Sequence, residues 1–542
     1  MKTFVLSGNT GKRKNTYQIA YKELLNDAQY DAVMHHFGYG LVIAGAGTGK
    51  TRTLVYRVAR LVEDSVKPEH ILLLTFTRRA AAEMLDRSAA LLDERCKNVR
   101  GGTFHHYCNQ LLHRFADVIG YPETFTLLDQ QDSQDALQFL RSPFVKKNKL
   151  KRFPQKQTLQ SIISTSVNRQ ITMYEALARD YPQFLDQHDH IHELALSYAT
   201  FKEEQGVMDF DDLLLRTKEL LQKEEVRRII AKENHFVMVD EYQDTNALQA
   251  EIAFLASSYH KNLMAVGDDA QSIYAFRGAD YRNIFQFPKK AEPCRVITLE
   301  KNYRSTMEIL GLTNHLMKTA QEKYDKTLYS DKTQGDLPGL VKAPDERDQS
   351  RFVAQMILQL REQEIPLGEM AVLFRNGRDS YDLEWELNAM SIPFRKYGGL
   401  KFEESAHIKD LIAHLKVVIN PEDQMAWSRI LQLLDGLGPK TADELIFWLK
   451  SNKEKSLQEY ITTSNTFKKG IKTLGELLSS IKEHYFNPKE AIRLLAEYYR
   501  PMCEKKFDDF PKRWKDLEAF ILLCTSFSNL DEMVQQLILD PI

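Results

Sequence analysis

The chain has 542 residues, of which 43% are hydrophobic and 27% charged, and its formal net charge is -2. At roughly 150 residues per domain, this length excludes a single core and indicates three or four domains. The near-neutral charge excludes a global positive field for nucleic acid, so any basic surface must be local. Five dispersed cysteines, without zinc spacing, indicate a reducing cytoplasm. The sequence contains neither a signal-peptide core nor an apolar run of about 18 residues, so we expect no membrane span.

Short apolar runs predict the strands. Five of them are apolar on both faces, as parallel strands covered by helices are, and they lie at 41–44, 71–76, 236–240, 263–268 and 296–299. Helical patterning follows most of these runs, which predicts a doubly wound α/β sheet. A sixth strand is predicted at 370–376. Residues 105–205 and the chain from 381 onward read as almost wholly helical, and we interpret the first of these as an insertion in the sheet.

A glycine-rich turn follows the first strand and leads directly into a helix. The turn and the start of the helix comprise Ala44, Gly45, Ala46, Gly47, Thr48, Gly49, Lys50 and Thr51. Glycines let backbone N–H groups surround phosphates, Lys50 neutralises the terminal phosphate oxygens, and the Thr51 hydroxyl ligates magnesium. The alternative is a glycine-rich turn with a chance Lys-Thr pair, which the strand–turn–helix context disfavours. The stretch therefore predicts a P-loop that binds ATP and magnesium, although Ala44 departs from the usual glycine.

A second strand end supplies the acids that a P-loop enzyme requires. The run "FVMVD" ends in Asp240, which is followed by Glu241. We expect Asp240 to hold the magnesium ion through its water shell and Glu241 to polarise the attacking water. Two glutamines fit the same site more weakly. Gln271 follows another strand and could sense the γ-phosphate, and Gln29 precedes the P-loop and could read adenine, but either could equally be a surface residue.

Taken in order, the motifs of this chain resemble those of the UvrD/Rep-type superfamily 1 helicases. The matching stretches are "LNDAQYDAV", "AGAGTGKTRTL", "ILLLTFTRRAAAEM", "GGTFHHYC", "MDFDDLL", "VDEYQDTN", "VGDDAQSIYAFRGAD" and "LEKNYRS", with weaker matches in "GGLKFEESAHIKDL" and "DGLGPKTADEL". The resemblance covers nearly the whole chain, and eight ordered motifs are far more specific than any single one.

The resemblance implies two RecA-like domains with ATP between them and single-stranded DNA across both, with translocation in the 3′→5′ direction. We expect the first RecA-like domain at 1–100 and 206–284, its helical insertion at 101–205, the N-terminal part of the second RecA-like domain at 285–380, and a second helical insertion at 381–542. By position, Gln29 contacts adenine, Tyr303 stacks on it, and Arg52 lies near the nucleotide. Arg304 reaches the γ-phosphate from the second domain, which would couple hydrolysis to domain closure.

Family analogy also names the residues on the DNA side. They are Phe76, His105, Tyr274, Phe276 and Arg277. Aromatic faces stack on any base, which a motor that walks along arbitrary sequence requires. Core packing is the alternative for each aromatic ring. Phe276 often aligns with Trp, Ala270 with Asp, and Arg78-Arg79 with Asn-Lys in relatives. The basic stretch 144–156 and the turn in 435–445 could contact phosphates, but a solvated loop and a plain helix connection remain equally open.

The family's last two motifs are not found in this sequence. We therefore expect a chain that lacks the C-terminal motor segment, with an open sheet edge in its second domain and no second γ-phosphate arginine. A shortened chain or gene fragment, a split enzyme completed by a second polypeptide, and an evolved regulator would each explain this.

We expect a 3′→5′ helicase or translocase of DNA repair or replication that binds single-stranded DNA and its junctions with duplex. An ATP-responsive single-strand binding module or regulator is the alternative. A different P-loop enzyme, such as a nucleotide kinase or a transport ATPase, is disfavoured by the ordered aromatic and arginine motifs.

Overall fold

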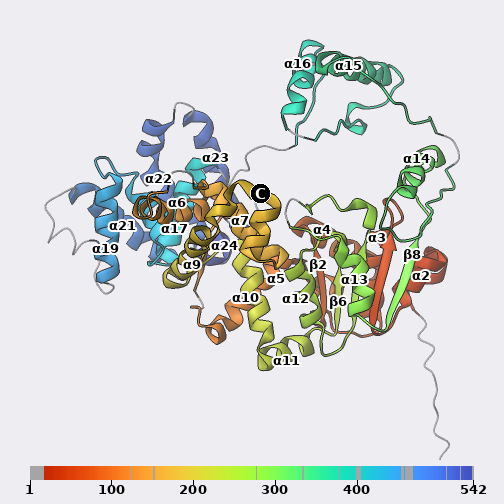
Figure 1. The fold of residues 1–542 in the computed structure, drawn as a ribbon, viewed down its shortest axis with the longest axis horizontal. Coiled ribbons are helices and arrows are strands. Elements are labelled where there is room, and N and C mark those ends of the chain that lie inside the picture. The colour runs from red at the N-terminus through yellow and green to blue at the C-terminus, as the bar shows by residue number, and fades with distance from the viewer. Residues whose placement is uncertain are drawn as a thin grey trace, which may run out of the picture.

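The computed structural model describes residues 17–539, apart from residues 123, 151–152, 276–277, 333–334, 376, 398–404, 453–456, 458–467, 508–509 and 525–526. A sheet covered by helices forms one part, a group of helices forms another, and the helices α14 Met307–Lys318, α15 Glu346–Glu362 and α16 Tyr381–Ala389 follow the last strand of the sheet (Figure 1). This arrangement bears out the predicted α/β fold with helical insertions.

Six parallel strands form the main sheet, in the order β3-β2-β6-β7-β1-β8. The strands are β1 Tyr39–Ala44, β2 Ile71–Thr75, β3 Arg100–Thr103, β6 Phe236–Val239, β7 Leu263–Gly267 and β8 Cys294–Leu299. The five strands predicted from apolar runs are confirmed. β3 was not predicted because its sequence, RGGT, contains two glycines and has little strand propensity. It forms an edge of the sheet, where one neighbour is enough.

Alternate residues of each inner strand enter opposite cores, which explains why these strands are apolar on both faces. In β1, Leu41 and Ile43 belong to one buried cluster, whereas Val42 and Ala44 belong to the other. Because helices cover both faces of a parallel sheet, neither face tolerates polar side chains. Within the sheet domain, the helices around the first core are α5 Phe104–Phe115, α10 Phe210–Gln222, α11 Glu224–Glu233, α12 Ala247–Ala256 and α13 Arg282–Lys290, and buried residues between 408 and 538 extend the same core. Those around the second core are α1 Tyr21–Leu24, α2 Asp27–Met34, α3 Lys50–Glu63 and α4 Arg78–Leu91.

The first helical insertion leaves and rejoins the sheet domain through a short pair of parallel strands, β4 Thr126–Leu127 and β5 Val207–Met208. Between them lie α6 Gln130–Lys147, α7 Lys156–Arg169, α8 Met173–Asp180 and α9 His188–Gln205, which share a core of their own. The predicted insertion, 101–205, therefore begins too early. Most of β3 and all of α5 fall inside that range but belong to the sheet domain, since β3 pairs with β2 and α5 packs against α10.

The chain after β8 differs from the prediction. β8 pairs with β1, so the first sheet extends past the predicted boundary at residue 284. The following helices are α14 Met307–Lys318, α15 Glu346–Glu362 and α16 Tyr381–Ala389. The strand predicted at 370–376 is wrong for its described residues, 370–375, which have no regular structure. The side chain of Leu373 there is 93% exposed. An apolar run becomes a strand only beside a partner strand, and none of the described residues provides one here.

The rest of the chain is helical in its described residues, as predicted. It contains α17 Ala406–Ile419, α18 Gln424–Leu431, α19 Pro439–Ser451, α21 Lys468–Glu483, α22 Pro488–Lys506, α23 Phe510–Leu523 and α24 Leu530–Leu539. The turn between α18 and α19 contains Gly436, whose φ of +83° suits glycine. In α17, Lys409 lies 3.0 Å from Asp129 and Lys416 pairs with Asp132, which ties this part of the chain to the first insertion.

Short 3-10 helices complete the described structure. They are η1 Pro68–His70, η2 Glu94–Asn98, η3 Ala116–Ile119, η4 Pro182–Gln187, η5 Tyr242–Asp244, η6 Asp269–Gln271, η8 Leu367–Glu369 and η9 Gly377–Ser380. Among the described helices, none combines the length and the apolar character needed to cross a membrane.

Candidate functional site

The glycine-rich turn joins the carboxyl end of β1 to the N-terminus of α3. Gly47 and Gly49 have φ values of +77° and +90°, a region that side chains other than glycine rarely adopt. Lys50 and Thr51 open the first turn of α3, where backbone N–H groups have no partner within the helix. The partial positive charge of a helix N-terminus favours anions, so the turn has the geometry of a phosphate site.

The two acids predicted at the end of β6 lie beside this turn. Lys50 Nζ is 2.6 Å from Glu241 Oε2, and Glu241 itself adopts a left-handed backbone conformation with φ +49°. Asp240 is 8% exposed, and its Oδ1 is buried without a hydrogen-bond partner. Burial and the nearby Glu241 carboxylate raise the pKa of Asp240 to about 7. A buried carboxylate oxygen with no donor is a suitable ligand for a cation.

The residues present fit a magnesium ion that is shared with a nucleotide. Mg²⁺ prefers oxygen ligands and usually takes only one or two from the protein, with waters and phosphates supplying the others. Thr51 and Asp240 offer a hydroxyl and a carboxylate of this kind. In the part of the chain that the structure describes, no cluster of three or more His, Cys, Asp or Glu side chains is arranged to hold a metal without such help.

Gln243, which the sequence reasoning did not single out, joins the two strand ends of the site. Its Nε2 donates to Glu241 Oε2 at 2.9 Å, and its Oε1 accepts a bond from the backbone N–H of Asp268 at 2.9 Å. The predicted phosphate sensor Gln271 then donates to Asp268 Oδ2 at 2.6 Å. A continuous chain of hydrogen bonds thus runs from Glu241 to Gln271. The position of Gln243, two residues after Glu241, was the only signal in the sequence.

The residues predicted to contact adenine lie on the other side of the turn. Gln29 is 1% exposed, and its Nε2 donates to the carbonyl of Thr48 at 2.9 Å. A Cβ on Gly49 would lie 2.6 Å from this amide, so the contact requires glycine. Tyr303 is 46% exposed and accepts a hydrogen bond from Asn26. Arg52 donates to the carbonyl of Leu24 at 2.9 Å. These side chains therefore surround the turn, and their roles toward adenine remain predictions.

The segment that carries Arg304 follows β8 directly and packs on the P-loop turn. Asn302 Nδ2 donates to the carbonyl of Ala46 at 2.6 Å, and the N–H of Tyr303 donates to the carbonyl of Gly47 at 2.9 Å. A Cβ on Gly47 would meet Arg304 Cβ at 2.7 Å. Arg304 was expected to approach from a second domain, but here it extends from the edge strand of the same sheet. Asn302, 3% exposed, was not predicted, because a single asparagine carries no distinctive signal.

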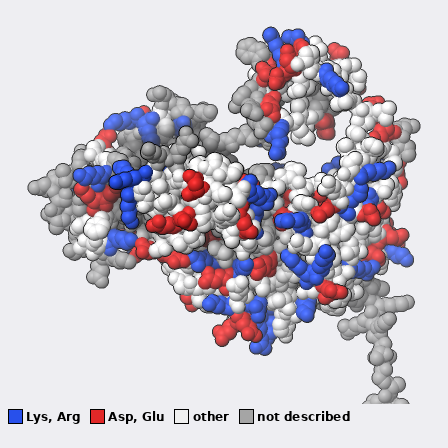
Figure 2. Space-filling view, in the orientation of Figure 1, with Lys and Arg blue, Asp and Glu red and all other residues white. Residues whose placement is uncertain are grey.

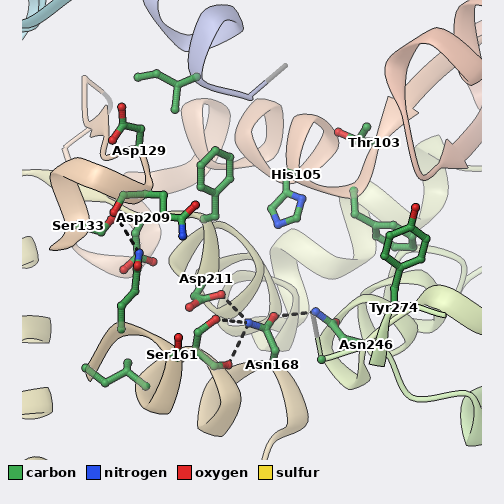
Figure 3. A pocket seen from close by; sticks show the side chains of 18 of the residues that line it. Thr103, His105, Asp129, Ser133, Ser161, Asn168, Asp209, Asp211, Asn246 and Tyr274 are labelled. Atoms are coloured by element: carbon green, nitrogen blue, oxygen red, sulfur yellow. Dashed lines mark hydrogen bonds between the residues drawn. The ribbon is translucent and has the colours of Figure 1, made fainter. Parts of the chain in front are cut away.

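A cavity of about 860 Å³ opens between the sheet domain, the first insertion and the helices α17 and α24. Three of the predicted DNA contacts, Phe76, His105 and Tyr274, line it. Figure 3 shows His105 and Tyr274 on its walls. The ring centroids of Phe76 and Tyr274 are 4.5 Å apart, and the His105 ring packs edge-on against the Phe210 ring. Burial lowers the pKa of His105 to about 4, so its ring is neutral at pH 7. Phe276 and Arg277 lie outside the described residues.

The same cavity reaches the nucleotide site, because Asp240 and Glu241 also line it. Carboxylates such as Asp129 and Asp211 lie along its walls, whereas Lys409 contributes a positive charge. On the face drawn in Figure 2, basic and acidic side chains are intermingled. In the basic stretch 144–156, Lys156 is paired with Asp135 at 2.5 Å, while Lys146 and Lys147 are exposed. Phosphate contacts by this stretch remain a prediction.

Comparison with known proteins identifies the family. The model of the UvrD/REP helicase N-terminal domain matches residues 25–292, and that of the UvrD-like helicase C-terminal domain matches residues 297–537. The chain is 32% identical over 539 residues to the ATP-dependent DNA helicase PcrA of Leuconostoc citreum, an alignment that covers 96% of this chain and 70% of that protein. It is 34% identical over 500 residues to PcrA of Staphylococcus aureus (strain COL), covering 89% and 67%. For PcrA of Staphylococcus epidermidis (strain RP62A) the identity is 33% over 428 residues, covering 78% and 57%.

These matches correct one expectation from the sequence. A chain lacking the C-terminal part of the motor was predicted from two motifs that could not be found, but the C-terminal domain model matches 297–537. The prediction of a missing segment is therefore not supported, nor is that of a second polypeptide that completes it. The chain spans 57–70% of the length of the relatives named here. With both family models matched in order, the chain belongs to the UvrD/Rep family of ATP-dependent DNA helicases.

Proposed function

We propose that this chain hydrolyses ATP in the turn between β1 and α3 and uses the energy to move along single-stranded DNA in the 3′→5′ direction. The observation that carries the proposal is the shared cavity, which has Asp240 and Glu241 at one end and Phe76, His105 and Tyr274 along its walls. Because one cavity is lined both by the acids of the ATP site and by aromatic rings that can stack on bases, a bound DNA strand can influence ATP hydrolysis. The PcrA relatives are named as ATP-dependent DNA helicases, which agrees with this proposal.

Lys50 Nζ and Glu241 Oε2 form an ion pair at 2.6 Å. We infer that a triphosphate entering the turn takes Lys50 as its own counter-charge and thereby frees Glu241. The carboxylate can then accept a proton from the attacking water, since a general base must be within reach of the proton it abstracts. Binding the substrate would thus switch on the base. Gln243 keeps Glu241 in place as Lys50 leaves, because its amide donates to the same oxygen.

A magnesium ion held by Thr51 and Asp240 would neutralise developing charge on the phosphate oxygens when bound. Arg304 adds a second positive charge from the segment after β8, which rests on the turn. Gln271 is connected to Glu241 through Gln243 and Asp268. A change in the position of Glu241 can therefore reach Gln271, in the loop after β7 that also carries Tyr274.

We expect a bound single strand of DNA to place its bases, rather than its phosphates, in the cavity. The acidic groups along its walls repel phosphate, whereas the rings of Phe76 and Tyr274 offer apolar faces. Stacking is tolerant of base identity, as a motor requires, and each stacked base contributes about 1–3 kcal/mol. Junctions between single-stranded and duplex DNA are the substrates on which such movement would separate strands.

The proposal is tested by measuring ATP hydrolysis with and without oligo-dT, for the wild type and for Lys50→Ala. We expect hydrolysis that oligo-dT stimulates in the wild type, and a loss of at least about 10²–10³-fold in the variant, because a charge aimed at the phosphates is removed. Lys97→Ala, an exposed lysine on η2, is the matched control and should behave as the wild type. Unchanged hydrolysis in Lys50→Ala would contradict the proposed site. ATP-dependent DNA binding without hydrolysis would favour the single-strand binder instead.

A further inference from the structure

The C-terminal end of α7, in the first insertion, docks against two loops of the sheet domain. Asn168 lies in the last turn of this helix and is 7% exposed. One loop, after β6, carries the acids Asp240 and Glu241 and continues to Asn246. The other, after β7, carries Tyr274 and continues to Gly278. Figure 3 shows Asn168 between Asp211 and Asn246, on the cavity wall opposite His105.

The side chain of Asn168 uses both ends of its amide. Its Nδ2 donates to Asp211 Oδ1 at 2.5 Å and to the carbonyl and hydroxyl oxygens of Ser164, both at 3.0 Å. Its Oδ1 accepts a hydrogen bond from Asn246 Nδ2 at 2.7 Å. Among side chains of this size, only an amide combines a donor and an acceptor in this way. The polar atoms of Asn168 are thus directed at protein groups rather than at a ligand in the cavity.

Through Asn246, this amide is connected to the loop that bears the acids. Asn246 is 5% exposed and caps α12, accepting a bond from the N–H of Gln249 at 2.8 Å. The preceding residue, Thr245, accepts bonds at its carbonyl from the N–H of Asp280 and from Asn283 Nδ2. The loop after β6 therefore has few ways to move without changing the Asn246–Asn168 hydrogen bond.

The same helix end touches the loop that bears Tyr274. Gly278 has a φ of +83°, and a Cβ on it would lie 3.0 Å from Asn168 Cβ. The next residue of α7, Arg169, donates from Nη2 to the carbonyl of Ala275 at 3.2 Å. A base that stacks on Tyr274 and moves the neighbouring Ala275 would disturb the end of α7, because Arg169 donates to the Ala275 carbonyl.

We propose that Asn168 is a positioning residue that transmits the presence of DNA at Tyr274 to the acids at the end of β6. This inference rests on the proposed function and adds to it the route of communication. The route consists of the loop after β7, the end of α7, the amide of Asn168 and the hydrogen bond to Asn246. It requires that the helical insertion serve as a rigid connection between the two loops of the sheet domain.

The route makes a prediction that a merely structural role does not share. Asn168→Ala removes the hydrogen bonds but leaves Phe76, Tyr274, Lys50 and Glu241 in place. We expect the ATP hydrolysis rate without DNA and the affinity for oligo-dT to stay within about twofold of the wild type. The stimulation by oligo-dT should fall about tenfold, within the range that coupling between two sites usually spans.

A second substitution tests the other side of the same bond. Asn246→Ser keeps an oxygen that caps α12 but has no amide to reach Asn168. It should lose the same stimulation, and the double variant Asn168→Ala/Asn246→Ser should lose no more than either single variant, because both remove one shared interaction. The matched control is Gln170→Ala. Gln170 lies two residues from Asn168, and its amide bonds with Lys218 and the carbonyl of Val167.

The experiment measures ATP hydrolysis with and without oligo-dT, the affinity for labelled oligo-dT, and the thermal midpoint of each variant. Loss of stimulation alone, in both single variants and not in Gln170→Ala, supports the route. Full stimulation in Asn168→Ala overturns it. A parallel fall in basal rate, DNA affinity and thermal midpoint also overturns it, since that result describes a structural tie. A wild type whose hydrolysis does not respond to oligo-dT contradicts the proposed function itself, and the route then has nothing to transmit.

Discussion

The nucleotide end and the nucleic-acid end of the candidate site are built in different ways. The turn between β1 and α3 is one continuous stretch, and its shape depends on glycines at 47 and 49. The cavity beside it is assembled from segments far apart in the chain, including Phe76, His105 and Tyr274. A local motif can be recognised from residue order, whereas a cavity depends on how separate segments pack. Function at the first end should therefore respond to single side chains, and function at the second to contacts between segments.

The largest effect is expected at the nucleotide end, from Glu241→Gln. Removing the base should lower the rate of ATP hydrolysis by about 10²–10⁴-fold. The same change removes the ion pair that holds Lys50. ATP should therefore bind up to about fivefold more tightly, since a partly exposed ion pair contributes no more than about this much. Steady-state ATP hydrolysis tests the expected loss of rate, and a separate measurement of ATP affinity tests the expected tighter binding.

Glu83→Gln, which alters an exposed ion pair with Arg87, is the control for a lost carboxylate. Weaker ATP binding in Glu241→Gln would show that Glu241 does not compete with the nucleotide for Lys50.

At the nucleic-acid end, Phe76→Ala should weaken the affinity for oligo-dT by about 1–3 kcal/mol, because one stacking face is lost. The rate of ATP hydrolysis without DNA should not change. Phe37→Ala is the control, since Phe37 is 72% exposed and precedes the N-terminal end of β1, whereas the P-loop turn follows the opposite end of that strand. Equal losses of affinity in both variants, measured by fluorescence anisotropy, would remove Phe76 from the DNA site.

A smaller effect is expected where the two ends meet. Gln243→Met keeps the length of the side chain but removes its bonds to Glu241 and Asp268. The buried N–H of Asp268 is then left unpaired, which should lower the free energy of unfolding by about 1–3 kcal/mol. Hydrolysis should slow about tenfold, as expected for the loss of one orienting hydrogen bond.

Steady-state kinetics and urea denaturation measure the two effects of Gln243→Met. Normal kinetics together with reduced stability would confine Gln243 to a structural role.

The smallest effect concerns pH. Burial and the Asp209 carboxylate raise the pKa of Asp211 to about 6, above its ordinary value near 4. A carboxyl group whose pKa is raised by folding favours the folded state when protonated, and this contribution is lost as the pH rises from about 4 through 6. Asp211→Asn, which remains neutral, should therefore gain stability relative to the wild type between pH 5 and pH 7.5. A urea midpoint difference that does not change with pH would contradict the assignment.

Much of the sheet domain was predictable because its physical causes are local. Strands buried on both faces show as apolar runs, and the phosphate turn shows as glycines between a strand and a Lys-Thr pair. The strand predicted at 370–376 failed because an apolar run does not reveal whether a partner strand lies beside it. β3 escaped prediction for the opposite reason, since an edge strand pairs through its backbone and needs few apolar side chains.

The candidate site was predictable to the extent that each residue has a characteristic setting. Lys50, Asp240 and Glu241 were named because they follow strand ends, and the structure brings Lys50 and Glu241 together. Gln243, Asn302 and Asn168 act through contacts with residues distant in sequence, such as the Asn302 bond to Ala46. An amide in a helix or a loop looks the same in sequence whether it holds a loop or faces water. Such residues become visible only when the fold brings their partners together.

Whether one cavity joins ATP hydrolysis to the bound DNA strand is tested most directly by a crystal structure of the chain with a non-hydrolysable ATP analogue, magnesium and oligo-dT. We expect Lys50 to have left Glu241 for the triphosphate, with a base stacked against Phe76 and Tyr274 inside the cavity. An intact Lys50–Glu241 pair beside bound nucleotide, or an oligonucleotide that lies outside the cavity, would contradict the account.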